Sequence, residues 1–207
     1  MTAAPRPVRP ENGRRDLTDI AIDCFAHYGY KATSISRIAD AAGLTKGAIY
    51  YHFRDKEDLL FAAVADRLTQ FERSVTAQIL PLADAVVALR ETARVCLDHA
   101  TKSNHRRFIV TLMIEAIDTN ARLSEQFRAM MQRFRRFLGE IIEFGQRQGT
   151  FRPDVDAAMA ASVYAGAMMG AEIQYYQDPD GFDLEGTVTA FVDQYVQSLA
   201  APLANVP

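Results

Sequence analysis

The sequence predicts an all-α protein of about nine helices. Apolar residues recur three and four positions apart along most of the chain, which is the period of an amphipathic helix. Glycine, proline and asparagine interrupt this pattern, and no stretch of useful length alternates apolar and polar residues as a strand would. The expected helices span about residues 14–28, 35–42, 46–52, 56–79, 83–102, 105–118, 123–148, 155–177 and 184–200.

The N-terminal region predicts a flexible arm followed by the first helix. Residues 1–13 contain three prolines, two arginines and Gly13, a composition that does not favour a packed core. The arginines could enter a minor groove, although an untethered tail is the plainer interpretation. Gly29 ends the helix that follows. Its expected apolar stripe comprises Leu17, Ile20, Ala21, Cys24, Phe25 and Tyr28.

Residues 33–56 predict a helix-turn-helix, which is a DNA-binding motif. Thr33 or Ser34 can cap the first of two short helices, and Gly43 suits the left-handed conformation that ends it. Thr45 is the expected cap of the second helix, which runs to about His52. A helical hairpin that only packs in the core is the structural alternative. The residues expected to bury one face of each helix are Ile35, Ile38, Ala39, Ala42, Ile49 and Phe53.

The opposite face of this motif carries the candidate DNA contacts. Thr45 and Lys46 stand at the N-terminal end of the second helix, where side chains meet base edges in the major groove. The hydroxyl, imidazole and ammonium groups that follow are suited to phosphates. Tyr50 could instead be half buried, and His52 could serve as a cation at the helix C-terminus. The full candidate set is Thr33, Ser34, Thr45, Lys46, Gly47, Ala48, Tyr50, Tyr51, His52 and Lys56.

The order and spacing of these residues resemble the N-terminal domain of the TetR family of one-component transcriptional regulators, including its AcrR-like members. The matching positions are Phe25, Gly29, Tyr30, Thr33, Ile38, Ala39, Ala42, Gly43, Lys46, Gly47, Ile49, Tyr50, His52, Phe53, Lys56 and Leu59. The resemblance covers about residues 14–62. It implies a DNA-binding domain at 14–60, followed by an effector-binding and dimerisation domain at 61–207.

Composition and charge exclude a polybasic nucleic-acid coat protein. The formal net charge is −3, and hydrophobic content is 49%. Segment 31–56 is nevertheless basic, because it carries five lysines and arginines against Asp40 and Asp55. The rest of the chain is therefore acidic, which suits a specific operator binder. The basic residues of this segment are Lys31, Arg37, Lys46, Arg54 and Lys56.

Targeting and cofactor motifs are missing from the sequence. We find no signal-peptide core, no apolar run of membrane-spanning length and no zinc spacing. Cys24 and Cys96 lie in apolar helical patterns and suit buried thiols in a reducing compartment. We therefore expect a cytoplasmic protein without cofactor, metal or membrane partner. No phosphate loop or nucleophile–base motif is present, so we expect no enzyme; turnover of a bound metabolite would revive that alternative.

The last two expected helices predict a self-association face. Small residues allow close helix approach and are concentrated at Ala157, Ala158, Ala160, Ala161, Ala165, Gly166, Ala167, Gly170 and Ala171. The final helix adds Val188, Phe191, Val192, Tyr195, Val196 and Leu199. The resemblance implies a homodimer through a four-helix bundle of these helices, whereas the sequence alone equally allows an intramolecular core.

The middle helices supply candidates for an effector pocket, because methionine and aromatic side chains fill irregular apolar volumes. An ordinary core is the alternative for each of them. Glu115 interrupts an apolar run and could face a cationic ligand, His99 or Arg94; a solvent-facing position is the other interpretation. The candidates are Phe108, Leu112, Met113, Glu115, Met131, Phe134, Tyr164 and Met168.

These features together predict a ligand-responsive, DNA-binding transcriptional regulator. Repression of a palindromic operator, relieved by a small hydrophobic or amphipathic effector, is the expectation that the resemblance implies. The basic run Arg128, Arg133, Arg135 and Arg136 leaves acyl-CoA open as the effector, although a solvated helix face also explains it. A helical partner-binding protein with no small-molecule effector is the remaining alternative.

Overall fold

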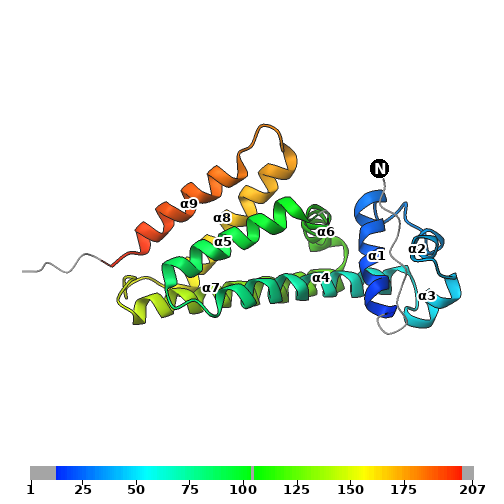
Figure 1. Cartoon of the computed structure of the whole chain (residues 1–207), viewed down its shortest axis with the longest axis horizontal. Helices are drawn as coiled ribbons and strands as arrows, with labels where there is room; N and C mark the ends of the chain where they lie inside the picture. The colour runs from blue at the N-terminus through cyan, green and yellow to red at the C-terminus, as the bar shows by residue number, and fades with distance from the viewer. Residues whose placement is uncertain (1–12, 104, 202–207) are drawn as a thin grey trace, which may run out of the picture. The chain divides into compact units, whose positions relative to one another are not determined.

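The computed structural model describes residues 13–103 and 105–201, and these are helical almost throughout (Figure 1). Each expected helix is present, and its ends lie within about two residues of those expected from the sequence. The described part of the chain contains one isolated β-bridge, between Phe151 and Ala200. The helices are α1 (Gly13–Tyr28), α2 (Ile35–Ala42), α3 (Lys46–His52), α4 (Lys56–Ile79), α5 (Ala85–Lys102), α6 (Arg106–Thr119), α7 (Ala121–Arg147), α8 (Ala157–Gln177) and α9 (Leu184–Leu199). The all-α prediction is confirmed.

The chain divides into two compact units. The first unit comprises the described residues up to Gln70 together with Ser103–Gln126, and the second comprises Phe71–Lys102 and the described residues from Phe127 onward. Helices α4 and α7 therefore contribute residues to both units. The boundary expected at residue 60 remains a prediction. The arm expected at 1–13 lies outside the described residues except for Gly13, which begins α1.

The first unit packs the three N-terminal helices against the start of α4 and against α6. Phe25 of α1 is fully buried and stacks on Phe108 of α6, with ring centroids 6.4 Å apart. Asp23 of α1 and His105, the N-cap of α6, form a second contact. The buried Thr18 hydroxyl donates to Asp66 of α4 at 2.7 Å. Helix α6 is therefore part of the same packed body as the helix-turn-helix.

The second unit encloses its own core between the C-terminal part of α4 and helices α5, α7, α8 and α9. Tyr164 of α8 is fully buried, and its hydroxyl donates to the Leu89 carbonyl of α5 at 2.7 Å. The hydroxyl of Tyr195 in α9 donates to the Ala160 carbonyl of α8 at 2.6 Å. These bonds satisfy two phenol groups that would otherwise be costly to bury.

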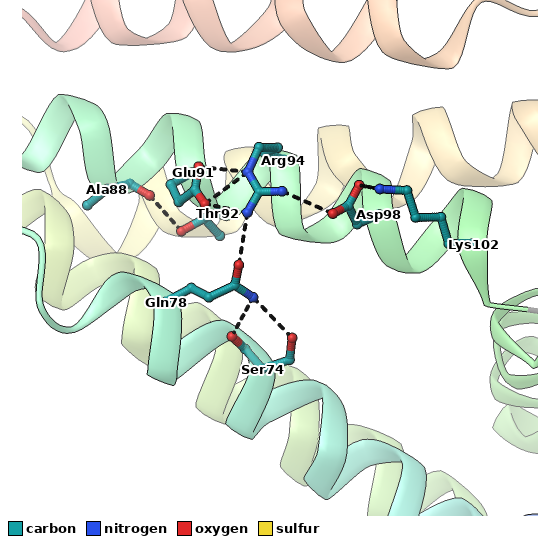
Figure 2. A network of polar contacts seen from close by, with 8 residues as sticks. All are labelled: Ser74, Gln78, Ala88, Glu91, Thr92, Arg94, Asp98 and Lys102. Carbon is teal, nitrogen blue, oxygen red and sulfur yellow. Dashed lines mark hydrogen bonds and ion pairs between the residues drawn. The ribbon is translucent and has the colours of Figure 1, made fainter.

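A polar network on the surface of the second unit joins α4 to α5 (Figure 2). The Arg94 guanidinium donates to Gln78 of α4 at 2.8 Å, to Asp98 at 3.0 Å and to both oxygens of Glu91. Arg94 thus has partners other than Glu115. These exposed ion pairs contribute about 1 kcal/mol or less each, so the apolar core dominates the stability of this unit.

No helix in the described residues is both long and apolar enough to cross a membrane.

Candidate DNA-binding site

Local hydrogen bonds define both helices of the expected helix-turn-helix. Ser34, rather than Thr33, caps α2, because its hydroxyl accepts from the Arg37 amide at 3.2 Å. Gly43 ends α2 at φ +66°, a conformation that strains residues with a Cβ atom. The Thr45 hydroxyl then accepts from the Ala48 amide at 3.2 Å and caps α3. The sequence predicted the cap of α3 and offered the cap of α2 as one of two alternatives.

Helix α3 has one buried face and one exposed face. Ile49 and Phe53 are buried in the first unit. Tyr51 is 85% exposed, whereas Tyr50 is 54% exposed, so the protein covers nearly half of Tyr50. The remaining exposed positions of this face are Thr45, Lys46, Gly47 and His52, with Ala48 partly exposed between them. The exposed face of α3 therefore offers hydroxyl, ammonium and imidazole groups beside a short stretch of small residues.

Thr33 has a different place from the one expected for a DNA contact. Its side chain is 1% exposed, and its hydroxyl donates to the Gly29 carbonyl at 2.8 Å and approaches the Cys24 carbonyl at 3.2 Å. A buried hydroxyl needs such partners, and here the backbone of the turn after α1 provides them. The role of Thr33 in the free protein is thus structural.

Lys56 also binds within the protein. Its Nζ donates to the Tyr30 carbonyl at 2.9 Å and to the Thr33 carbonyl at 3.0 Å. The same ammonium lies 4.4 Å from the centroid of the Tyr30 ring. Burial raises the pKa of the Tyr30 phenol, with smaller contributions from Glu57 and Asp55, so this ring stays neutral beneath the cation.

The start of α4 is fixed by its own capping residues. The Asp55 carboxylate accepts from the Asp58 amide at 2.7 Å, as expected of an N-cap. Arg54 donates to Asp58 from its side chain and its backbone, and these hydrogen bonds lower the pKa of the Asp58 carboxyl. Asp58 therefore carries a negative charge at neutral pH, which balances Arg54 directly after α3.

Arg37 contributes to the basic charge of residues 31–56, but the sequence pattern assigns no DNA contact to it. It is exposed on α2, and its guanidinium carbon lies 4.2 Å from the centroid of the Tyr28 ring. This stacking holds a positive charge beside the helix-turn-helix. The signal was the basic charge of 31–56, but only the fold shows that the Arg37 side chain is exposed and ordered by Tyr28.

The eight candidates for an effector pocket fall in different places. Phe108, Leu112, Met113 and Glu115 belong to the first unit, whereas Met131, Phe134, Tyr164 and Met168 belong to the second. Glu115 is exposed on α6, so the solvent-facing interpretation holds for it. Tyr164 uses its hydroxyl within the core, and burial raises its pKa well above 10.

One cavity in the second unit includes a candidate of that set. It has a volume of about 550 Å³ and opens between α7 and α8. Met131 and Arg135 of α7 form one wall, and Met169 and Ile173 are among the α8 residues opposite. The α8 wall also contains Ala165, Gly166 and Gly170, small residues for which the sequence predicted close helix packing.

Comparison with known proteins agrees with this architecture. Residues 17–63 match the family model for bacterial regulatory proteins of the tetR family, and residues 86–171 match the tetracyclin repressor-like C-terminal domain. The transcriptional repressor KstR2 of Mycolicibacterium smegmatis is 31% identical over 163 residues, covering 74% of this chain and 75% of the relative. KstR2 of Rhodococcus jostii is 28% identical over 199 residues, covering 93% and 94% respectively.

Solved structures show the same fold. A TetR transcriptional regulator from Chloroflexus aurantiacus superposes with a TM-score of 0.81 at 26% identity, over 93% of this chain and 98% of that one. FadR from Bacillus subtilis, solved in complex with stearoyl-CoA, has a TM-score of 0.72 at 24% identity, over 88% and 97%. With the capped helix-turn-helix and the helical second unit, these matches show that the chain belongs to the TetR family of DNA-binding transcriptional regulators.

Proposed function

We propose that this regulator represses transcription as a homodimer on a palindromic operator, and that a small hydrophobic or amphipathic effector releases it. The observation that carries the DNA-binding part is the exposed face of α3, where Tyr51 is 85% exposed beside Lys46 and His52. A tyrosine so exposed adds nothing to the core of the free protein, so a partner outside the chain explains it better. Operator binding would place the protein with the chromosome, in the bacterial cytoplasm.

The assigned contacts follow from position along α3. Thr45 and Lys46 begin the helix and would meet base edges, because the N-terminal end of a recognition helix enters the major groove. Tyr50, Tyr51 and His52 follow and would bind phosphates, which sets the register of the helix without reading sequence. Gly47 and Ala48 would allow the backbone to approach the groove wall, and Ser34 would approach a phosphate from the start of α2.

Helix α8 supports a dimer through the last two helices. Met159 and Val163 are 65% and 53% exposed, and Gly166 and Gly170 continue the same face at helical spacing. A Cβ atom added at either glycine would meet nothing within 4 Å, so packing inside the subunit does not require glycine there. A second helix that approaches this face closely would require it. A second copy of the chain is therefore the proposed occupant.

The cavity between α7 and α8 supports the effector part of the proposal. Its volume of about 550 Å³ lies within the range of small-molecule sites. Gly166 and Gly170 line the cavity as well as the proposed dimer face, so the partner subunit would complete its wall. Arg135 adds a cation to an otherwise mostly apolar lining. This arrangement suits an amphipathic anion, and FadR with bound stearoyl-CoA makes acyl-CoA a specific candidate.

Release requires a difference in effector affinity between two states of the protein. The effector must bind the DNA-incompetent state more tightly, since equal affinity for both states shifts no population. Helix α4 carries residues of both units and is the element through which we expect a change in the second unit to reach α3. Coupling is reciprocal, so operator DNA should weaken effector binding by the same factor. Equal effector affinity with and without operator would exclude this mechanism.

The test of DNA binding is selection of bound fragments from the source genome, followed by salt-titrated fluorescence anisotropy. Wild type should bind a palindrome tightly, with affinity that falls as salt rises. Tyr51→Ala should lose about tenfold or more in affinity, and Tyr51→Phe should show how much belongs to the hydroxyl alone. If wild type selects no specific fragment at any salt concentration, operator binding by the purified protein is refuted.

A further inference from the structure

Lys56 forms a hydrogen bond between the two ends of the helix-turn-helix. The chain from Thr33 to Lys56 contains all of α2 and α3, and the 3.0 Å hydrogen bond from the Lys56 ammonium to the Thr33 carbonyl joins its two ends. Thr33 directly precedes Ser34, the N-cap of α2, and Lys56 is the first residue of α4. A single side chain therefore fixes the residue that precedes the cap of α2 relative to the first residue of α4.

The turn that receives this ammonium is itself tightly built. We define the α1–α2 turn as residues 29–34. Gly29 adopts φ +82°, the Thr33 amide donates to the Tyr30 carbonyl at 3.3 Å, and the Thr33 hydroxyl donates to the Gly29 carbonyl at 2.8 Å. The Tyr30 carbonyl accepts from Lys56 as well, at 2.9 Å. The cation therefore holds the two carbonyls between which the turn is formed.

The ammonium is largely committed to these partners. A lysine has three N–H donors, of which two serve the carbonyls of Tyr30 and Thr33. The ring of Tyr30 lies against the same nitrogen at 4.4 Å, and the Lys56 side chain is partly buried. Charge-assisted hydrogen bonds are about twice as strong as neutral ones, so a phosphate could take only the third N–H without displacing one of these two bonds.

We propose that Lys56 is a positioning residue for DNA recognition, holding the α1–α2 turn so that α2 and α3 are presented in one arrangement, and that it is not a phosphate contact. The DNA part of this inference rests on the proposed function, in which α3 reads the operator. The structural part does not, because it concerns the free protein. The two roles differ in what they predict for a neutral substitution.

The first test measures the free protein. Lys56→Met keeps the apolar stem against Tyr30 but removes every donor. Lys31→Met is the matched control, because Lys31 is an exposed cation in the same turn that makes no ion pair or hydrogen bond among the described residues. Amide hydrogen exchange across residues 29–35 should become at least about tenfold faster in Lys56→Met, because the loss of one charged hydrogen bond alone predicts about this factor and the variant loses two. Exchange should stay unchanged in Lys31→Met. Unchanged exchange in Lys56→Met would overturn the proposal.

The second test measures DNA binding by the same variants. Lys56→Met should lose about tenfold in affinity for the selected operator, while its affinity for random DNA and its salt slope should match those of Lys31→Met. A direct phosphate contact predicts the opposite: operator and random DNA lose affinity alike, and the slope falls by about 1.8 more than in the control, because each dimer carries two Lys56 side chains at about 0.9 per phosphate. That result, or wild-type operator affinity despite faster exchange, would refute the positioning role.

Lys56→Gln is a milder variant that allows the same measurements if Lys56→Met does not fold. Lys56→Gln is as neutral as Lys56→Met but keeps an amide donor, so exchange of the turn should fall between wild type and Lys56→Met. The amides of the turn in Lys56→Gln could instead exchange as in wild type, while the salt slope of DNA binding falls as far as a lost phosphate contact predicts. In that case the side chain acts on DNA through its charge, and the proposal is wrong. Should wild type itself select no operator, the proposed function fails, whereas the exchange result still decides whether Lys56 holds the turn.

Discussion

The Asn120 side chain links the corner between α6 and α7 to the first turn of α4. Its amide nitrogen donates to Glu57 at 3.0 Å, and its amide oxygen accepts from the Leu123 backbone at 3.0 Å, which caps α7. Arg122 strengthens the same corner, because it pairs with Asp58 at 3.7 Å and its guanidinium lies 4.1 Å from the Phe61 ring centroid. Helix α4 is thus held at adjacent residues, by the α1–α2 turn at Lys56 and by the α6–α7 corner at Glu57.

A double-mutant cycle on Asn120 and Glu57 should separate these two functions of the amide. Asn120→Ala should lower the free energy of unfolding by about 1–2 kcal/mol, since it removes a helix cap and a hydrogen bond. Glu57→Ala alone should cost only a few tenths of a kcal/mol, as the bond is exposed. Urea unfolding should give a coupling energy of about 0.5 kcal/mol between the sites. A coupling energy of zero would show that only the cap matters.

Lys46→Met should change the sequence preference of DNA binding. If Lys46 reaches a base edge, its loss should cost about 1–3 kcal/mol on the operator and relax selection at a few positions of each half-site. Fragment selection with the variant measures this directly. Lys31→Met is again the charge-matched control. An unchanged preference would remove Lys46 from base recognition and leave it as a phosphate contact at most.

Gly166→Leu should weaken the dimer without damaging the subunit. A Cβ atom at this position meets nothing within 4 Å, so the free subunit has room for a side chain. The proposed partner helix would clash with it, and the dimer dissociation constant should rise about 100-fold or more in analytical ultracentrifugation. Lys31→Leu, in the α1–α2 turn of the first unit, is the control and should leave the dimer intact. Unchanged association in Gly166→Leu would place the interface elsewhere.

Gly145→Ala should destabilise the second unit, although alanine normally favours a helix over glycine. A Cβ atom at Gly145 would lie 2.2 Å from the Phe151 ring and 2.9 Å from the Ala85 Cβ, and Phe151 is almost fully buried. We expect a loss of about 1–3 kcal/mol in chemical unfolding. Gly139→Ala, on the same helix, has its nearest contact at 3.8 Å and should instead gain about 0.5–1 kcal/mol. Equal effects at the two sites would contradict the close packing of Phe151.

Stability should fall at alkaline pH because of Tyr195. Burial raises the pKa of this phenol to about 12 in the folded state, against 10.0 for an unperturbed tyrosine. The folded state therefore keeps its proton where the unfolded state releases it, so this contribution is complete below pH 10 and is lost as the pH rises to about 12. The loss should be on the order of 1–2 kcal/mol.

Tyr195→Phe should flatten this pH dependence, measured as the free energy of unfolding between about pH 9 and 12. Tyr51→Phe is the control, because Tyr51 is exposed and its substitution should leave the slope unchanged. A wild-type slope in Tyr195→Phe would assign the alkaline loss to other groups, of which the buried Tyr164 is the first candidate, since burial also raises its pKa.

The amino-acid sequence by itself determined where the helices lie and which face of each is apolar. Gly43, Thr45 and Asp55 act within a few residues of their own positions, through a left-handed φ or a cap bond, so local pattern was enough to assign them. The exposure of Lys46 and Tyr51 also follows from the local pattern, because a helix that buries Ile49 and Phe53 must turn its opposite side outward.

Tertiary structure alone decided what the polar groups contact. Thr33 and Lys56 looked like DNA contacts in the sequence, yet one hydroxyl is buried under a turn and one ammonium binds carbonyls 26 and 23 residues away. Glu115 interrupts an apolar run but is exposed, and the space beside Gly166 depends on which helices pack around it. Helical period specifies the side of a helix on which a residue stands. It carries no information about which distant backbone or helix lies opposite, because that follows from the packing of the whole unit.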